Sequence, residues 1–333
     1  MDDLGVKYTD KEFIQLERRL KKLYSECEKD IQKQMDVFFA KFEKKNAAML
    51  DEMKGLKGDE LKAAQDAYQK WLKGQVFIGK RWQDKKDSIS NTLLHTNEAA
   101  VNMVNQTVPN VFQMNANFAA YQMEKGKGVN FSFNLYDSTV VREILAKDKA
   151  ILPYKHLNKK EDIRWNFQNI KNIVTKGIVK GESVDKIARN LAKEMPNRNM
   201  KMVRTHARTM LTSAQNQGRL VRFEEAQDMG IDVKKQWVAT LDQRTRETHQ
   251  ELDGQIRDLD EPFVVEGMEI MEPADPHADP SLVYNCRCTM NSVIAKYPNR
   301  YKERIARDDE GHNYKISNMT YKEWAEWKEG GDE

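Results

Sequence analysis

The chain has 333 residues, of which 32% are charged and 39% hydrophobic, and its formal net charge at pH 7 is +3. This length allows one large domain or two to three smaller ones. A membrane-spanning helix needs a run of about 18 apolar residues, and the sequence has no such run. No membrane partner is therefore expected. There are only three cysteines, and two of them lie in one Cys-x-Cys, so a disulfide scaffold is not expected either.

The N-terminal part of the chain is expected to be helical. Over residues 10–54 apolar side chains recur at intervals of three and four residues, the pattern of a helix with one buried seam. Residues 54–58, with two glycines, break this helix, and Asp59 is placed to cap a second one. The pattern predicts a long helical hairpin.

Another helix is expected over residues 82–108, ended by Pro109, with a short helix over 110–123. The alternation in Val129–Leu135 is typical of a strand with one apolar face. We assign residues 1–135 to a helical N-terminal region that mediates assembly.

Residues 136–230 are expected to form a basic helical region. Ser183 is the predicted N-cap of a helix that ends before Pro196, and a long polar helix follows over 199–229, with Gly230 at its C-terminus. Residues 142–222 contain 19 Lys and Arg and 7 Asp and Glu, and are therefore basic. Residues 223–285 contain 5 Lys and Arg and 16 Asp and Glu, and are therefore acidic.

This charge pattern indicates either partners of opposite charge or neutralisation of the two blocks within the fold. If the basic block binds double-stranded DNA without sequence preference, its contacts are expected at Lys201, Arg204, Arg208 and Arg219.

After Gly230 the periodicity changes to short strands. A strand is predicted near residues 233–239, a hairpin around Gly267, and a further strand over 286–293. Residues 231–295 therefore read as a small α+β module, followed by an aromatic and charged tail over 296–333. The predicted fold class is mainly α with this C-terminal α+β module.

Two strings of residues in this module form a recognisable motif. The first consists of Trp237, Asp242, Arg244, Arg246, His249, Leu252, Asp253 and Gly254, and the second of Pro273, Ala274, Asp275, Pro276, Asn285, Cys286, Arg287 and Cys288. Together they resemble the C-terminal domain of the Mu protein F-like head-morphogenesis family of tailed-phage minor head proteins. The resemblance covers residues 165–295, and Ala274 stands where the family has glycine.

The resemblance implies a minor capsid protein that acts in head morphogenesis. Its expected partners are the portal protein and the major capsid or scaffold proteins. Its expected location is the virion, inside the capsid near the portal, after assembly in the host cytoplasm. The alternative is a zinc-dependent hydrolase or an effector delivered with the genome. Phosphate-loop, Gly-x-Ser-x-Gly and His-Glu-x-x-His motifs are missing from the sequence, so we do not expect an enzyme.

His249, Asp253, Cys286 and Cys288 are candidate ligands of a structural zinc ion, because imidazole, carboxylate and thiolate groups all bind zinc. In the alternative, Asp253 and Gly254 form a turn, His249 bonds to the backbone and the thiols are buried. Arg244, Arg246 and Arg287 either hold an anion or brace the loops by pairing with nearby aspartates.

Overall fold

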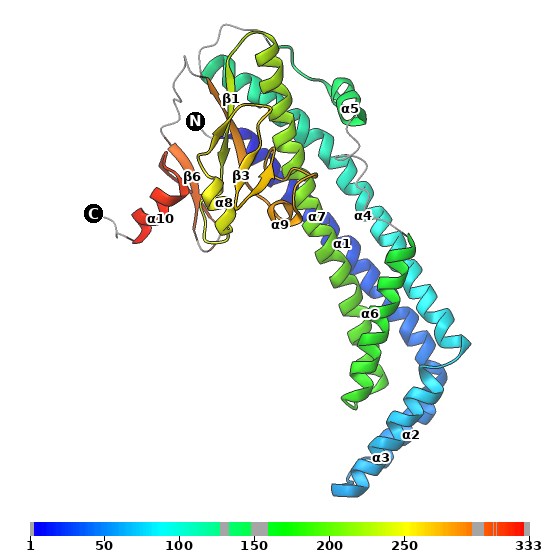
Figure 1. Ribbon diagram of the computed structural model, residues 1–333. Coiled ribbons are helices and arrows are strands. Elements are labelled where there is room, and N and C mark those ends of the chain that lie inside the picture. The colour runs from blue at the N-terminus through cyan, green and yellow to red at the C-terminus, as the bar shows by residue number, and fades with distance from the viewer. Residues whose placement is uncertain are drawn as a thin grey trace. The chain divides into compact units, whose positions relative to one another are not determined.

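Figure 1 shows the computed structural model, in which helices predominate and the strands of the described residues all follow residue 230. The predicted fold class is therefore confirmed. The structure describes residues 3–126, 133–147, 159–294, 303–308, 310 and 312–329. They fall into two compact units: one comprises residues 1–17, 103–154 and 204–333, and the other comprises residues 18–102 and 155–203.

The units differ from the sequence-based boundaries at residues 135, 230 and 295. The reason is that three long helices have residues in both units, namely α1 (Leu4–Phe39), α4 (Lys80–Tyr121) and α7 (Val184–Asp228).

The unit containing residues 18–102 and 155–203 is helical. Besides parts of α1, α4 and α7 it comprises η1 (Ala40–Phe42), α2 (Glu43–Glu52), α3 (Gly58–Trp71), η2 (Leu72–Val76) and α6 (Lys159–Val179). The predicted seam of α1 is buried here, as at Leu20 and Ile31. The predicted cap is corrected: α3 begins at Gly58, and Asp59 lies in its first turn, where its charge favours the helix N-terminus.

Pro109 and Pro196 do not end helices as predicted, since each lies inside one. An internal proline costs about 3 kcal/mol because it removes a backbone hydrogen bond and its ring crowds the preceding turn. Both prolines are flanked by buried side chains, Val108 and Val111 around the first and Met195 around the second. Burial of several such residues on each side outweighs the cost, at about 1.5–3 kcal/mol per large apolar side chain.

Among its described residues, the other unit combines helix ends with three small antiparallel sheets. Its strands are β1 (Val233–Val238), β2 (Ile256–Arg257), β3 (Phe263–Val265), β4 (Met268–Ile270), β5 (Thr289–Ile294), β6 (Glu303–Arg307) and β7 (Asn313–Ser317). The sheet order is β2-β1-β5, with β3-β4 and β6-β7 as separate hairpins. Its further helical segments are η3 (Gln122–Gly126), α5 (Ser138–Lys147), α8 (Glu247–Leu252), α9 (Pro280–Val283) and α10 (Tyr321–Glu329).

Several local predictions are confirmed. Ser183 accepts a hydrogen bond from the Lys186 amide, and Gly230 follows α7 with a φ of +87°. The hairpin around Gly267 is β3-β4, and β1 pairs with β5 with Trp237 opposite Met290. The strand predicted over 129–135 lies partly outside the described residues, and its described part, 133–135, is not a strand.

The tail after residue 295 is not separate from the module. Its hairpin β6-β7 and helix α10 pack on the module through a cluster of Leu241, Ala306, Tyr321 and Trp324. Leu241 and Ala306 also form a parallel β-bridge. The tail therefore contributes to the core of this unit.

Gly218 on α7 is required for close packing against α4. A Cβ atom at this position would lie 2.6 Å from the carbonyl oxygen of Phe112. We expect Gly218→Ala to lower the free energy of unfolding by about 1–3 kcal/mol, because backbone atoms would have to move apart. Thermal or denaturant melts measure the change. Gly74→Ala is the matched control, since its Cβ would meet nothing within 4 Å, and equal destabilisation by both substitutions would contradict the packing argument.

Candidate functional site

His249, Cys286 and Cys288 form a buried cluster. The Nδ1 atom of His249 lies 3.3 Å from the sulfur of Cys288 and 3.8 Å from that of Cys286. The three ligand-type atoms all lie within 4.8 Å of one another, and each residue is only 2% exposed. Burial, and then the neighbouring Cys286, raise the pKa of Cys288 well above its ordinary value. A substrate has no access to this cluster.

The orientation of His249 is fixed by its surroundings. Its Nε2 atom lies 2.9 Å from the carbonyl oxygen of Leu282 and must donate to it, since a carbonyl only accepts. In a neutral imidazole, the other ring nitrogen, Nδ1, then presents a lone pair to the thiols. The Trp237 ring packs edge to face on the imidazole, with centroids 5.4 Å apart.

The polar face of α7 holds the Cys-x-Cys segment through its backbone. Thr212 donates its hydroxyl to the carbonyl of Cys286 over 2.8 Å, and Asn216 donates its amide to the carbonyl of Cys288 over 3.1 Å. Thr209 accepts from the amide of Asn285, which has a φ of +58°. These three α7 residues were not predicted as site residues, although their spacing of three and four places them on one helix face.

Asp253 does not join the cluster, in contrast to the predicted ligand set. Helix α8 ends at Leu252, so Asp253 leaves the helix and no longer shares a face with His249. Its carboxylate instead pairs with Arg304 at 2.7 Å and accepts from the amides of Ala239 and Tyr321. As in the metal-free alternative, Asp253 and Gly254 form a turn, with Gly254 at a φ of +83°.

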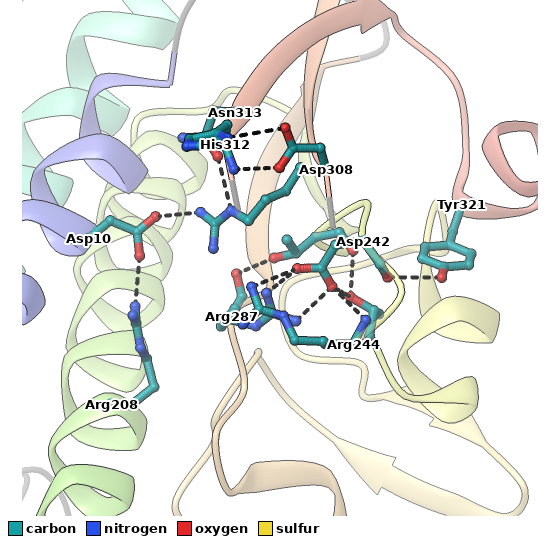
Figure 2. Close-up of polar contacts among 12 residues, drawn as sticks. Asp10, Arg208, Asp242, Arg244, Arg287, Asp308, His312, Asn313 and Tyr321 are labelled. Atoms are coloured by element: carbon teal, nitrogen blue, oxygen red, sulfur yellow. Dashed lines mark hydrogen bonds and ion pairs between the residues drawn. The ribbon is translucent and has the colours of Figure 1, made fainter. Parts of the chain in front are cut away.

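The motif arginines brace loops. Arg287 donates two hydrogen bonds to the carboxylate of Asp242, one of them over 2.8 Å. Figure 2 shows this pair, with Arg244 beside the same carboxylate. Arg246 donates to the carbonyls of Ser281 and Tyr284. Burial alone would raise the pKa of Asp242, but the hydrogen bonds and charge of Arg287 outweigh burial, so the pKa lies below its usual range.

Ala274 keeps the turn geometry that glycine favours. Its φ is +67°, in the left-handed region, where a Cβ costs about 1–2 kcal/mol. Asp275 stabilises the turn, since its carboxylate accepts from the amides of Met271 and His277. The departure from the family pattern therefore leaves the backbone path intact.

The predicted DNA contacts on α7 are mostly engaged within the protein. In this unit α7 pairs with α1 and the residue before it in reverse chain order, through Arg219 with Asp3, Arg208 with Asp10 and Arg204 with Glu17, at 2.6–2.7 Å. Figure 2 shows the central pair, Asp10 and Arg208, and Arg307 also donates to Asp10.

This arrangement corrects two of the predicted contacts. Arg219 is fully buried and cannot reach a duplex, and Arg208 is largely covered, stacked 3.6 Å above the ring of Phe13. Lys201 is exposed, and Arg204 is half-exposed. Arg204, Arg208 and Arg219 thus pair with acidic residues on or just before α1. Pairing between the basic and acidic blocks also occurs, since Arg222 pairs with Glu225 at 2.6 Å.

A cavity of about 440 Å³ opens beside Trp237, between β1, α1 and the hairpin β6-β7. Arg287, Arg304 and Arg307 line it, but each is already paired with a carboxylate. The cavity therefore has no free cationic group among these arginines with which to select an anion.

Comparison with known proteins gives two relatives and one domain match. A family model described as Phage Mu protein F like protein matches residues 168–291. The minor head protein GP7 of Bacillus phage SPP1 is 26% identical over 324 residues, which are 97% of this chain and 96% of GP7.

The NAD(+)–arginine ADP-ribosyltransferase EFV of Enterococcus faecalis is 33% identical over 216 residues. That alignment takes in 62% of this chain but only 40% of the enzyme's length. No solved structure matches the chain.

Asp242→Asn tests the contribution of the buried pair with Arg287. The substitution removes the negative charge with little change in shape and leaves the guanidinium without its counter-ion. We expect a loss of about 2–4 kcal/mol in the free energy of unfolding at neutral pH. Arg244→Ala is the control, because Arg244 is 68% exposed and 3.5 Å away, and exposed pairs contribute at most about 1 kcal/mol.

The depressed pKa of Asp242 also predicts how the stability difference between the parent and Asp242→Asn depends on pH. A carboxylate whose pKa is depressed on folding stabilises the fold above the unfolded-state pKa of about 3.9. That contribution is lost as the pH falls through the lower folded-state value. The stability difference between parent and Asp242→Asn should therefore narrow below about pH 4, in urea melts across this range. A difference that stays constant down to acid unfolding would contradict the assignment.

Proposed function

Because this chain belongs to the Mu protein F-like family of phage minor head proteins, we propose that it is incorporated at the portal vertex and packaged with the genome. The observation that carries the proposal is the alignment with a minor head protein along nearly the full length of both chains. The portal vertex departs from the repeated arrangement of the shell, so it offers a position for a protein that is present in few copies. None of the described helices is long and apolar enough to cross a membrane.

The enzyme alternatives have weaker support. A zinc hydrolase needs an open coordination position that a substrate can reach, and His249, Cys286 and Cys288 are each only 2% exposed. ADP-ribosylation is the named activity of EFV, and the alignment leaves 60% of that enzyme unmatched. We therefore favour a structural role in the head.

We propose that the chain also contacts DNA, through a different surface from the one predicted. Among the described residues, a group of exposed cations that form no ion pair lies on α6 and on the first half of α7, including Lys171, Lys176, Arg189, Lys193 and Lys201.

Three of these cations form a stripe along one side of α7. Arg189, Lys193 and Lys201 are spaced by multiples of four residues, so they lie within about a third of the helix circumference. The stripe extends about 18 Å at 1.5 Å per residue. Over this length the stripe can face several phosphates of a duplex, because the phosphate charges lie about 1.7 Å apart along the duplex axis.

The first test is the composition of the particle. We expect mass spectrometry of purified procapsids and mature virions to detect the chain in both, in fewer copies than the major capsid protein. We also expect crosslinks to the portal protein in preference to the shell. Absence from both particles would overturn the proposal of a head protein, whereas presence with crosslinks only to the shell would overturn the portal position.

The second test compares two triple charge reversals. Each neutralised phosphate contributes about 0.9 to the slope of log affinity against log salt. Arg189→Glu, Lys193→Glu and Lys201→Glu together should lower duplex affinity and reduce that slope by about 2–3 in a titration across salt concentrations. The control is Lys22→Glu, Lys29→Glu and Lys33→Glu, exposed residues on α1 of the same unit. If both triple variants lost the same duplex affinity, DNA binding would depend on net charge alone, and the proposed surface would be wrong.

A further inference from the structure

We propose that His249, Cys286 and Cys288 bind one Zn²⁺ ion that joins α8 to the Cys-x-Cys segment before β5. The proposal rests on the geometry of this cluster and does not depend on the role of the protein in the head. It differs from the ligand set expected from the sequence, because Asp253 is excluded.

The distances fit tetrahedral zinc. Bonds of about 2.3 Å to sulfur and about 2.0–2.1 Å to nitrogen, at a tetrahedral angle, place nitrogen and sulfur ligands about 3.5 Å apart. The two separations from Nδ1 of His249 are 3.3 Å and 3.8 Å, on either side of this value. Only small side-chain shifts are needed to admit the ion.

The histidine is already oriented as a metal ligand. Histidines that bind metals usually donate their second ring nitrogen to a carboxylate, a carbonyl or water, which fixes the tautomer. Here Nε2 of His249 donates to the carbonyl of Leu282, and Trp237 packs against the ring. The lone pair of Nδ1 is left facing both sulfurs.

A metal satisfies the cluster better than hydrogen bonds do. Nδ1 has one lone pair and can accept from one thiol, so within the cluster the other thiol has only a sulfur to donate to, and sulfur is a weak acceptor. Two thiolates, one neutral imidazole and Zn²⁺ together carry no net charge. The loaded site can therefore be buried without an uncompensated charge.

The fourth ligand should be a neutral oxygen, since another anion would charge the buried site. Asn216 contacts the backbone of the Cys-x-Cys segment, since its side-chain amide donates to the carbonyl of Cys288, and also to those of Thr212 and Pro273. Its Oδ1 atom is buried and has no hydrogen-bond partner among the described residues. This oxygen has the chemistry that the remaining position requires.

The ion would stabilise a part of the fold that has little regular structure. After α8 ends at Leu252, residues 253–286 contain only short strands and the four-residue helix α9. A bond between the ends of this segment reduces the conformational entropy of the unfolded chain. The role is structural because the cluster is closed to substrates.

The experiment measures zinc in the full-length protein, expressed with zinc and purified in reducing buffer. Elemental analysis should find about one equivalent in the parent. The combined variant Cys286→Ser and Cys288→Ser, and separately His249→Gln, should hold less than about a tenth of this amount. Cys27→Ser is the matched control, because Cys27 is also a buried free cysteine but lies in the other unit.

Two further measurements keep the test decisive if a variant fails to fold. The variant Asp253→Asn should retain zinc. If Asp253 were instead a ligand, this variant would lose zinc. A chelator should lower the melting temperature of the parent, and added zinc should restore it. A folded parent that holds no zinc and melts identically with and without chelator would overturn the proposal, as would equal zinc content in the parent and in the cysteine variant.

Discussion

The unit that carries the motif depends on one buried guanidinium. Arg219 on α7 is fully inaccessible and donates five hydrogen bonds, two to Asp3 ahead of α1, two to Asn115 on α4 and one to the carbonyl of Met290 on β5. Arginine has five N–H donors, so all of them are used. Removing any partner would leave a buried charge incompletely solvated, which is among the most destabilising changes a core can undergo. Gly5 and Gly218 allow this approach because a Cβ atom at either position would collide with the groups around it.

Arg219 forms the last of three successive ion pairs between α7 and the N-terminal residues of the chain. These pairs explain part of the uneven distribution of charge along the sequence. Asp3, Asp10 and Glu17 are spaced by seven residues on or just before α1, and they pair with arginines of α7 in reverse order. Seven residues are close to two helical turns, so the acids lie on one face. The basic block at 142–222 thus has two parts: its C-terminal arginines stabilise the fold, whereas described cations of α6 and the first half of α7, such as Lys171, Arg189 and Lys193, are exposed to solvent. Net charge over a sequence window does not distinguish these parts, which is why Arg208 and Arg219 were misassigned as DNA contacts.

The sequence predicts local structure well where the signal is local. The caps at Ser183 and Gly230, the hairpin at Gly267 and the strand at Trp237 depend on residues within a few positions. The pairing of Arg287 with an aspartate was one of two open alternatives, and the structure selects it. Predictions that depend on distant burial fail. Prolines 109 and 196 continue their helices because apolar side chains around them pack on other elements.

The role of Asp253 shows why the site itself could be predicted only in part. His249 and Asp253 are four residues apart, and a helix of ordinary length would place both at the cysteines. Helix α8 has six residues and ends between them, because Asp253 accepts from the amides of Ala239 and Tyr321 and pairs with Arg304. Two of these three partners follow residue 295, beyond residues 168–291 that the family model matches. The tail thereby holds the carboxylate away from the cysteines, and Tyr321 also donates its hydroxyl to the carbonyl of Asp242. The composition of the buried cluster is therefore decided by a segment that carries none of its ligands.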